Sequence, residues 1–124
     1  MLAVLPQSAR LFLASFAFLG LAACGGSSTQ PATSPEPQPT ATVNATNSLQ
    51  FTPTTVRVTV GGTVTFKFGS IEHTLFFDNA PAGAPANIPN LTSNTSVTRT
   101  FNTAGTFVYN CHIHPGMSGT VIVQ

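Results

Sequence analysis

The sequence predicts an all-β domain built as a small sandwich or barrel. Apolar and polar residues alternate over several short runs, and turn-forming residues separate these runs. No stretch of the domain has helical periodicity, and the chain is rich in Phe, Val and Thr, which favour strands. Many short strands with frequent turns are typical of a sandwich or a barrel, and 124 residues suffice for one such domain.

The low charge of the chain excludes several classes of protein. Only 6% of the residues are charged, four Lys and Arg against three Asp and Glu. A nucleic-acid partner would require a basic patch that neutralises phosphates, and we expect none. A charge-rich disordered protein and a coiled coil are excluded for the same reason.

The first 23 residues are typical of a signal peptide. Arg10 is their only charge, and the apolar to weakly polar run from Leu11 to Ala23 is shorter than the roughly 20 residues that span a bilayer. Leu21-Ala22-Ala23-Cys24 resembles a bacterial lipobox, so we expect Cys24 to be lipidated and to become the first mature residue. The expected location is the cell envelope, anchored to a membrane and facing the periplasm or the exterior. A buried helix with a stray Cys is the alternative.

Residues 24–41 are predicted to be a tether that starts at the lipidated Cys. The segment from Gly25 to Ala41 contains no aromatic or large aliphatic residue, so it cannot bury enough surface to offset its ordering entropy. A Pro-rich spacer extends by about 3.1 Å per residue, which gives a reach on the order of 50 Å. The folded domain is then expected at residues 42–124.

The strands of this domain are predicted from alternation and turn residues. Residues 56–60 and 64–68 alternate on either side of Gly61-Gly62, which favours a hairpin. Residues 79–94 are rich in Ala, Pro, Gly and Asn and are expected to form a long loop. We expect further strands at residues 73–77, 96–101, 106–111 and 119–123. Five aromatic side chains are expected in the core: Phe51, Phe66, Phe68, Phe107 and Tyr109.

Side chains able to bind a soft metal are concentrated in one loop. Beyond Cys24, the Cys, His and Met residues of the mature chain are His73, Cys111, His112, His114 and Met117. With Cys24 lipidated, Cys111 has no disulfide partner. An unpaired thiol in an exported protein usually has a specific role, because the compartment is oxidising. A thiolate, two imidazoles and a weak thioether are the ligand set of a blue-copper electron-transfer site. His73 is the remote candidate that would complete the set.

The same residues also have an interpretation without a metal. Cys111 can be a small buried hydrophobe and Met117 a core residue that fills space. His73 can be a hydrogen-bonded histidine at the end of a strand. Because the spacing of the loop and the order of the strands would then be coincidental, we favour the metal site.

Several motifs occur in a fixed order: Phe51-x-Pro53, Gly61-Gly62-Thr63-Val64-x-Phe66, His73, Phe101-x-x-x-Gly105-x-Phe107-x-Tyr109-x-Cys111, His114 and Met117. These motifs resemble those of the cupredoxins of the plastocyanin and azurin superfamily, and the short ligand loop looks most like that of amicyanin. The resemblance implies a Greek-key β-sandwich that holds one copper ion, with His73, Cys111 and His114 as equatorial ligands and Met117 as the axial one. It also implies transfer of single electrons between redox proteins through His114.

Three residues depart from the pattern of that family. Thr74 stands where Asn often follows the first ligand His, and its hydroxyl is a candidate to tie the ligand-bearing loops together. Ile113 stands where amicyanin-like loops usually carry Pro, and we expect its N–H to point at the thiolate and favour reduced copper. His112 adds an imidazole beside Cys111. Alternation places it on the opposite side, facing solvent, and the alternative is that it competes for the metal.

Other functions are weighed by what they would require. A multicopper oxidase needs additional His-x-His pairs, and a binuclear copper site needs a second Cys in the loop. The sequence contains no motif with paired carboxylates and no nucleophile beside a base, so we do not expect an enzyme. The favoured function is a monomeric electron carrier whose transient redox partners dock on apolar surface from Pro115 and the loop Ala80–Ala86. A copper-binding or delivery protein is the first alternative, and a module with a vestigial or zinc-filled site is the second.

Overall fold

Eight strands and no helix make up residues 35–124, which are the part of the chain described by the computed structural model. The predicted all-β class is thereby confirmed, and no helix within these residues is able to cross a membrane. The predicted signal peptide and Cys24 lie outside the described residues. The strands are β1 (Gln38–Ala45), β2 (Phe51–Thr52), β3 (Thr55–Phe68), β4 (His73–Leu75), β5 (Ile88–Thr92), β6 (Thr95–Phe101), β7 (Gly105–Asn110) and β8 (Ser118–Val123).

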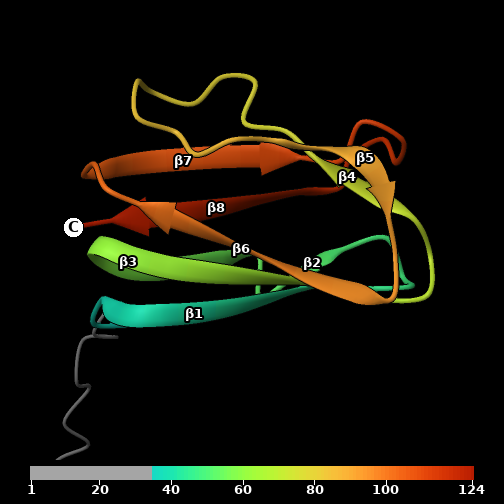
Figure 1. Cartoon of the computed structure of the whole chain (residues 1–124), viewed down its shortest axis with the longest axis horizontal. Coiled ribbons are helices and arrows are strands. Elements are labelled where there is room, and N and C mark those ends of the chain that lie inside the picture. The colour runs from blue at the N-terminus through green and yellow to red at the C-terminus, as the bar shows by residue number, and fades with distance from the viewer. Residues whose placement is uncertain (1–34) are drawn as a thin grey trace, which may run out of the picture. The chain divides into compact units, whose positions relative to one another are not determined.

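The strands are arranged as a sandwich with a mixed main sheet. The main sheet has six strands in the order β2-β1-β3-β8-β7, and β6 pairs with β3. The short strands β4 and β5 pair with each other, and a bridge between Phe76 and Asn110 connects them to β7. In Figure 1, β7 and β8 lie above β1 and β3. Buried residues from all eight strands form the hydrophobic core.

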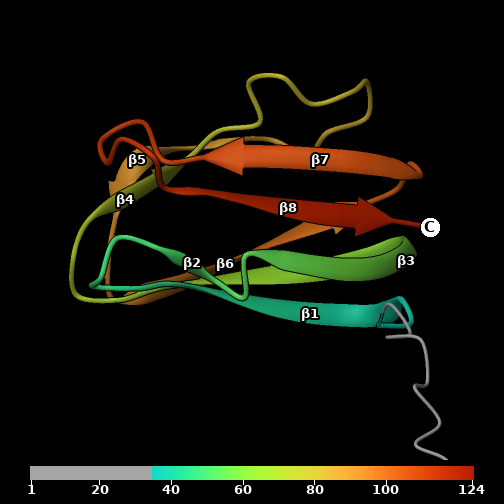
Figure 2. The same cartoon turned by 180° about the vertical axis from the view of Figure 1, so that it is seen from behind.

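The predicted hairpin at Gly61-Gly62 is wrong, because both of its arms belong to the single bent strand β3. The chain turns at Gly61, whose φ of 80° suits glycine, and a Cβ on Gly62 would lie 2.7 Å from the Thr59 carbonyl oxygen. The arm 55–58 pairs with β8, whereas the arm 62–68 pairs with β1 and β6 (Figure 2). The turn therefore connects two layers of the sandwich, because its arms pair with other strands and not with each other.

Two further strands begin where the sequence predicted irregular chain. β1 starts at Gln38, so the last four residues of the segment assigned to the tether belong to the sheet. β5 lies inside the segment 79–94 that was predicted to be a long loop. Its pairing with β4 is interrupted by a register shift, which leaves no regular alternation in the sequence.

Tyr109 lies at the centre of an aromatic core, and all five aromatic residues predicted for the core are buried. Its ring meets Phe51 and Phe66 edge-on at centroid distances of 4.9 and 5.2 Å. Burial raises the pKa of its hydroxyl, which has no hydrogen-bond partner among the described residues. The ring lies directly against Gly119 of β8, where a Cβ would collide with it.

The loop between β4 and β5 lies toward the end of β7 opposite Cys111. Pro81 approaches Gly105, the first residue of β7, and Gly83 lies against Thr103. Ala80 and Ala84 pack against the core. Arg99 holds the loop by donating to the carbonyl oxygens of residues 86 and 87, at 2.7 and 3.0 Å. The predicted contribution of Ala80–Ala86 to a surface around His114 is therefore wrong.

Both ends of the described domain meet at Val58. Gln38 pairs with Val58 at the start of β1, and the backbone N–H of Gln124 donates to the Val58 carbonyl at 3.1 Å. In Figure 1 these ends lie on the left, and the loop that follows β7 lies on the right. The chain thus enters and leaves the sandwich at the end opposite that loop.

Candidate metal centre

His73, Cys111 and His114 come together as the sequence predicted. Their candidate ligand atoms all lie within 4.8 Å of one another. The Nδ1 atoms of the two histidines are 3.2 Å apart, and Nδ1 of His114 is 3.5 Å from Sγ of Cys111. His73 begins β4, whereas Cys111 and His114 follow β7, so two distant segments of chain form the cluster.

The geometry of the loop follows from the strand that precedes it. Alternation along β7 buries Phe107 and Tyr109, and it continues one step beyond the strand to bury Cys111. The N–H of Cys111 donates to the Met117 carbonyl at 2.9 Å, and the N–H of Met117 donates to the His114 carbonyl at 3.1 Å. These bonds close the seven-residue loop and return the chain to β8.

Burial sets the protonation of His73, which has no exposed surface. Loss of hydration lowers its pKa below 6.5, nearby His114 lowers it further, and the backbone of Thr46 partly opposes both effects. The buried Nε2 has no hydrogen bond among the described residues. His73 is therefore neutral at pH 7, which is the form that binds a metal ion.

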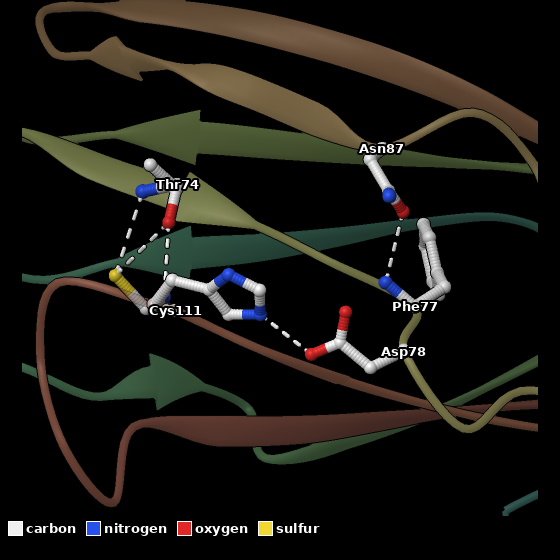
Figure 3. A network of polar contacts seen from close by, with 6 residues as sticks. Thr74, Phe77, Asp78, Asn87 and Cys111 are labelled. Carbon is white, nitrogen blue, oxygen red and sulfur yellow. Dashed lines mark hydrogen bonds and ion pairs between the residues drawn. The ribbon is translucent and has the colours of Figure 1, made fainter.

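Thr74 links the two segments of the site (Figure 3). Its N–H donates to Sγ of Cys111 at 3.4 Å, and its Oγ1 lies 3.8 Å from the same sulfur. The N–H of His112 donates to Oγ1 of Thr74 at 2.9 Å. This hydroxyl, which the sequence offered only as a candidate, thus connects the two ligand-bearing segments.

The expectation for Ile113 is not met. Within residues 35–124, no hydrogen bond joins its N–H to Sγ of Cys111, and the backbone donor to that sulfur is Thr74. The chain turns directly after Cys111, and the Ile113 side chain is 43% exposed. Among the described residues, Ile113 therefore contributes to the surface of the loop and makes no hydrogen bond to the thiol.

His112 faces away from the cluster, as alternation predicts. Its side chain is 46% exposed and its Nε2 contacts Oδ2 of Asp78. Its ring stacks on Phe76, with centroids 3.8 Å apart and planes inclined by 4°. Sequence reasoning did not single out Phe76 or Asp78. The only signal was their spacing of two and four residues from Thr74 on a predicted strand.

The donor set fits a soft metal ion. Two imidazole nitrogens and a thiol converge in a buried position, and soft thiolate with imidazole suits copper. Met117 is buried in the same loop, with 3% of its surface exposed. Its role as the axial ligand stays a prediction.

Three exposed apolar side chains lie on the ligand loop and on loops at the same end of the sandwich. Leu49, which has a positive φ of 60° and is 43% exposed, lines a hollow together with Gly116 and Met117. The side-chain Nδ2 of Asn47 donates to Oγ of Ser70, and its side-chain Oδ1 accepts the backbone N–H of Ser70. These two bonds join the Leu49 loop to the loop that precedes His73. The exposed apolar residues on these loops and on the ligand loop are Leu49, Ile71 and Ile113.

Comparison with known proteins gives one family and several solved structures. Residues 39–124 match the family described as copper binding proteins, plastocyanin/azurin family. A mutant of amicyanin in its reduced Cu(I) form is 27% identical with a TM-score of 0.59, and the match covers 76% of this chain and 95% of that one. A mutant plastocyanin of fern is 28% identical with a TM-score of 0.57, covering 67% and 99%.

A third match is a much larger protein. A copper-containing nitrite reductase from Thermus scotoductus is 27% identical with a TM-score of 0.59. The match covers 73% of this chain but only 23% of the reductase. No curated protein gives a significant match to the sequence.

Proposed function

Because the chain belongs to the plastocyanin/azurin family of copper-binding proteins, we propose that it carries single electrons between redox proteins at the cell envelope. The observation that carries this proposal is the buried group of His73, Cys111 and His114, with ligand atoms within 4.8 Å. His73, Cys111 and His114 would hold one copper ion, and Met117 would be a further ligand from the same loop. The matched amicyanins include both oxidised and reduced forms, which supports a redox role.

The chain would hold the ligands still during transfer. When bound, copper supplies a couple between Cu(I) and Cu(II). The hydrogen bonds from Cys111 to Met117 and from Thr74 to Cys111 fix the loop against β4. Burial of His73 and Cys111 keeps water away from the ligand atoms. Both features reduce the rearrangement that accompanies a change of charge.

His114 would serve as the electron port. It is the one member of the cluster that is not fully buried, and Ile113 and Pro115 flank it on the surface. The apolar side chains of Leu49, Ile71 and Ile113 would allow a redox protein to dock briefly on this end of the sandwich. Small apolar contacts suit partners that must dissociate after one electron has passed.

The location of the protein is proposed from residues outside the described domain. The lipobox-like sequence ending at Cys24 supports a lipid anchor, with the Pro-rich segment as a tether to the membrane. The domain would face the periplasm or the exterior. It would act as a monomer without nucleic acid and without turnover of a substrate.

Delivery of copper to another protein is the alternative function. A delivery protein must release its ion to a partner, which is easier when the ligands are exposed. Here His73 has no exposed surface and Cys111 is 5% exposed, and this burial favours retention of the ion.

The proposal is tested by adding Cu(II) to the purified protein and recording its visible spectrum. We expect an intense thiolate-to-copper band that is absent from the Cys111→Ser variant. The complex should then be reduced and reoxidised repeatedly without loss of copper. A colourless protein, or an unchanged band in Cys111→Ser, would reject the proposal. Transfer of copper to a chelator in each reduction step would favour delivery.

A further inference from the structure

His112 makes three contacts with the segment 74–78, which leaves β4 and ends in a turn. Its backbone N–H donates to Oγ1 of Thr74, its ring stacks on Phe76, and its Nε2 contacts Asp78. These partners are every second residue of the segment that begins with the ligand His73. Figure 3 shows Thr74 and Asp78 at the two ends of this set of contacts.

The contacts lie where backbone pairing between the two segments stops. Phe76 and Asn110 exchange both backbone hydrogen bonds, at 2.9 and 3.0 Å. Beyond Asn110, no hydrogen bond between two backbone groups joins the described ligand loop to the segment 73–78. From there, the position of Cys111 relative to β4 depends on the bonds of Thr74 and on the side chain of His112.

We propose that His112 is a positioning residue that keeps Cys111 in register with the segment that carries His73. The backbone of residue 112 is held from inside by Thr74, and its ring is held from outside by Phe76 and Asp78. Because residues 111 and 112 share a peptide bond, fixing the ring limits the motion of the thiol. The contact of Thr74 with Sγ then persists whether or not copper is present.

Among the contacts that hold residue 112, the parallel stacking of its ring on Phe76 is the most important. The two rings are almost parallel and in van der Waals contact, so they resist both sliding and tilting. The contact with Asp78 is a surface pair with 46% and 38% of the side chains exposed, and such pairs contribute little alone. An aromatic residue at position 112 should therefore keep most of the effect.

The experiment compares His112→Ala and His112→Phe with Val108→Ala. Val108 is an exposed residue on the same strand that precedes the loop, and it has no part in the site. In copper-free protein, we measure hydrogen exchange of the residue 112 amide by NMR. We expect exchange to be about fivefold to tenfold faster in His112→Ala and close to the original rate in His112→Phe and Val108→Ala.

The second measurement uses the same variants with Cu(II) added. We expect His112→Ala to shift and weaken the thiolate-to-copper band, and His112→Phe to restore it. Thermal unfolding confirms that each variant is folded. If His112→Ala matches Val108→Ala in both the exchange rate and the band, the proposal is wrong.

This inference rests on the proposed copper site only for its spectroscopic part. A missing band in the unmodified protein would reject the proposed function. The exchange rate in copper-free protein would still decide whether His112 positions the loop.

Discussion

Thr74 is the residue on which both halves of the site depend. Its hydroxyl accepts the N–H of His112 and also lies near Sγ of Cys111, so its own hydrogen is available to the sulfur. A valine has nearly the same shape but provides neither interaction. The residue therefore allows the contribution of one hydroxyl to be measured.

We predict that Thr74→Val destabilises the protein by about 1 kcal/mol, because the partly buried N–H of His112 loses its acceptor. The midpoint potential should also fall, since the sulfur loses a polar neighbour that favours reduced copper. Denaturant unfolding and redox titration measure these effects, with Thr74→Ser as the control that keeps the hydroxyl. Equal behaviour of the two variants would contradict the role of Thr74.

His73 makes the stability of the copper-free protein depend on pH. Its pKa is lowered in the folded state, so the unfolded chain binds a proton first as the pH falls below 6.5. We predict that stability is highest above this pH and declines below it until the folded-state pKa is passed. Denaturant unfolding at a series of pH values measures this slope. A His73→Asn variant should have a shallower slope, and an equal slope would show that other groups cause it.

At the level of strands, the aromatic core combines tight packing with one unpaired polar group. Tyr109 contacts aromatic rings on several sides, but its hydroxyl has no hydrogen-bond partner within residues 35–124. A buried hydroxyl without a partner lowers stability because it has lost its hydration.

We predict that Tyr109→Phe stabilises the protein by about 1 kcal/mol, since the ring contacts remain and the desolvation cost is removed. Tyr109→Leu is the matched control, and it should be less stable because the edge-on ring contacts are lost. Denaturant unfolding ranks the three proteins. A less stable Phe variant would mean that the hydroxyl is hydrogen-bonded to water.

Alternation predicted the orientation of residues much better than the partners of strands. It correctly placed the buried side chains of β7 and β8 and most of those of β3, because a period of two is a local property. Val60 is the exception, since the alternating run puts it on the inward face but its side chain is 53% exposed beside the turn at Gly61. It could not show that the arms of β3 pair with different strands, because pairing is decided by distant segments. The whole of β1 was missed, because it begins in a Pro-rich stretch and Val43 is the single large apolar residue among its eight.

The cluster was predictable for a chemical reason. His, Cys and Met are so few in this chain that four of them in seven residues stand out, and one remote histidine remained. The ring contacts of His112 with Phe76 and Asp78 were not predictable, because they depend on how β4 lies beside β7. The surface near His114 was misplaced for the same reason, since Ala80–Ala86 folds toward the other end of β7.

The molecule as a whole carries no net charge over its described residues. Three positive side chains, Arg57, Lys67 and Arg99, balance three negative ones, Glu36, Glu72 and Asp78. Long-range attraction toward a charged partner is therefore weak, and short-range apolar contact must provide the affinity.

We predict that the rate of electron transfer to a redox partner changes by less than about twofold between low and physiological ionic strength. Stopped-flow kinetics at several salt concentrations measures this dependence. An Ile113→Asp variant is the comparison, since a charge on the apolar surface should slow the reaction. A steep fall of the rate with salt in the unmodified protein would contradict docking by apolar contact.

The meeting of the start of β1 and the C-terminal residue Gln124 at Val58 has a practical consequence. Another domain or a solid support can be joined before Gln38 or after Gln124 without covering the ligand loop. Such a sandwich can be inserted into a longer chain as a unit, because its entry and exit lie side by side. The match to 23% of a nitrite reductase fits this use of the fold as a module. For the same reason, the domain can be attached to an electrode through residues before Gln38 or after Gln124, with the ligand loop facing solution.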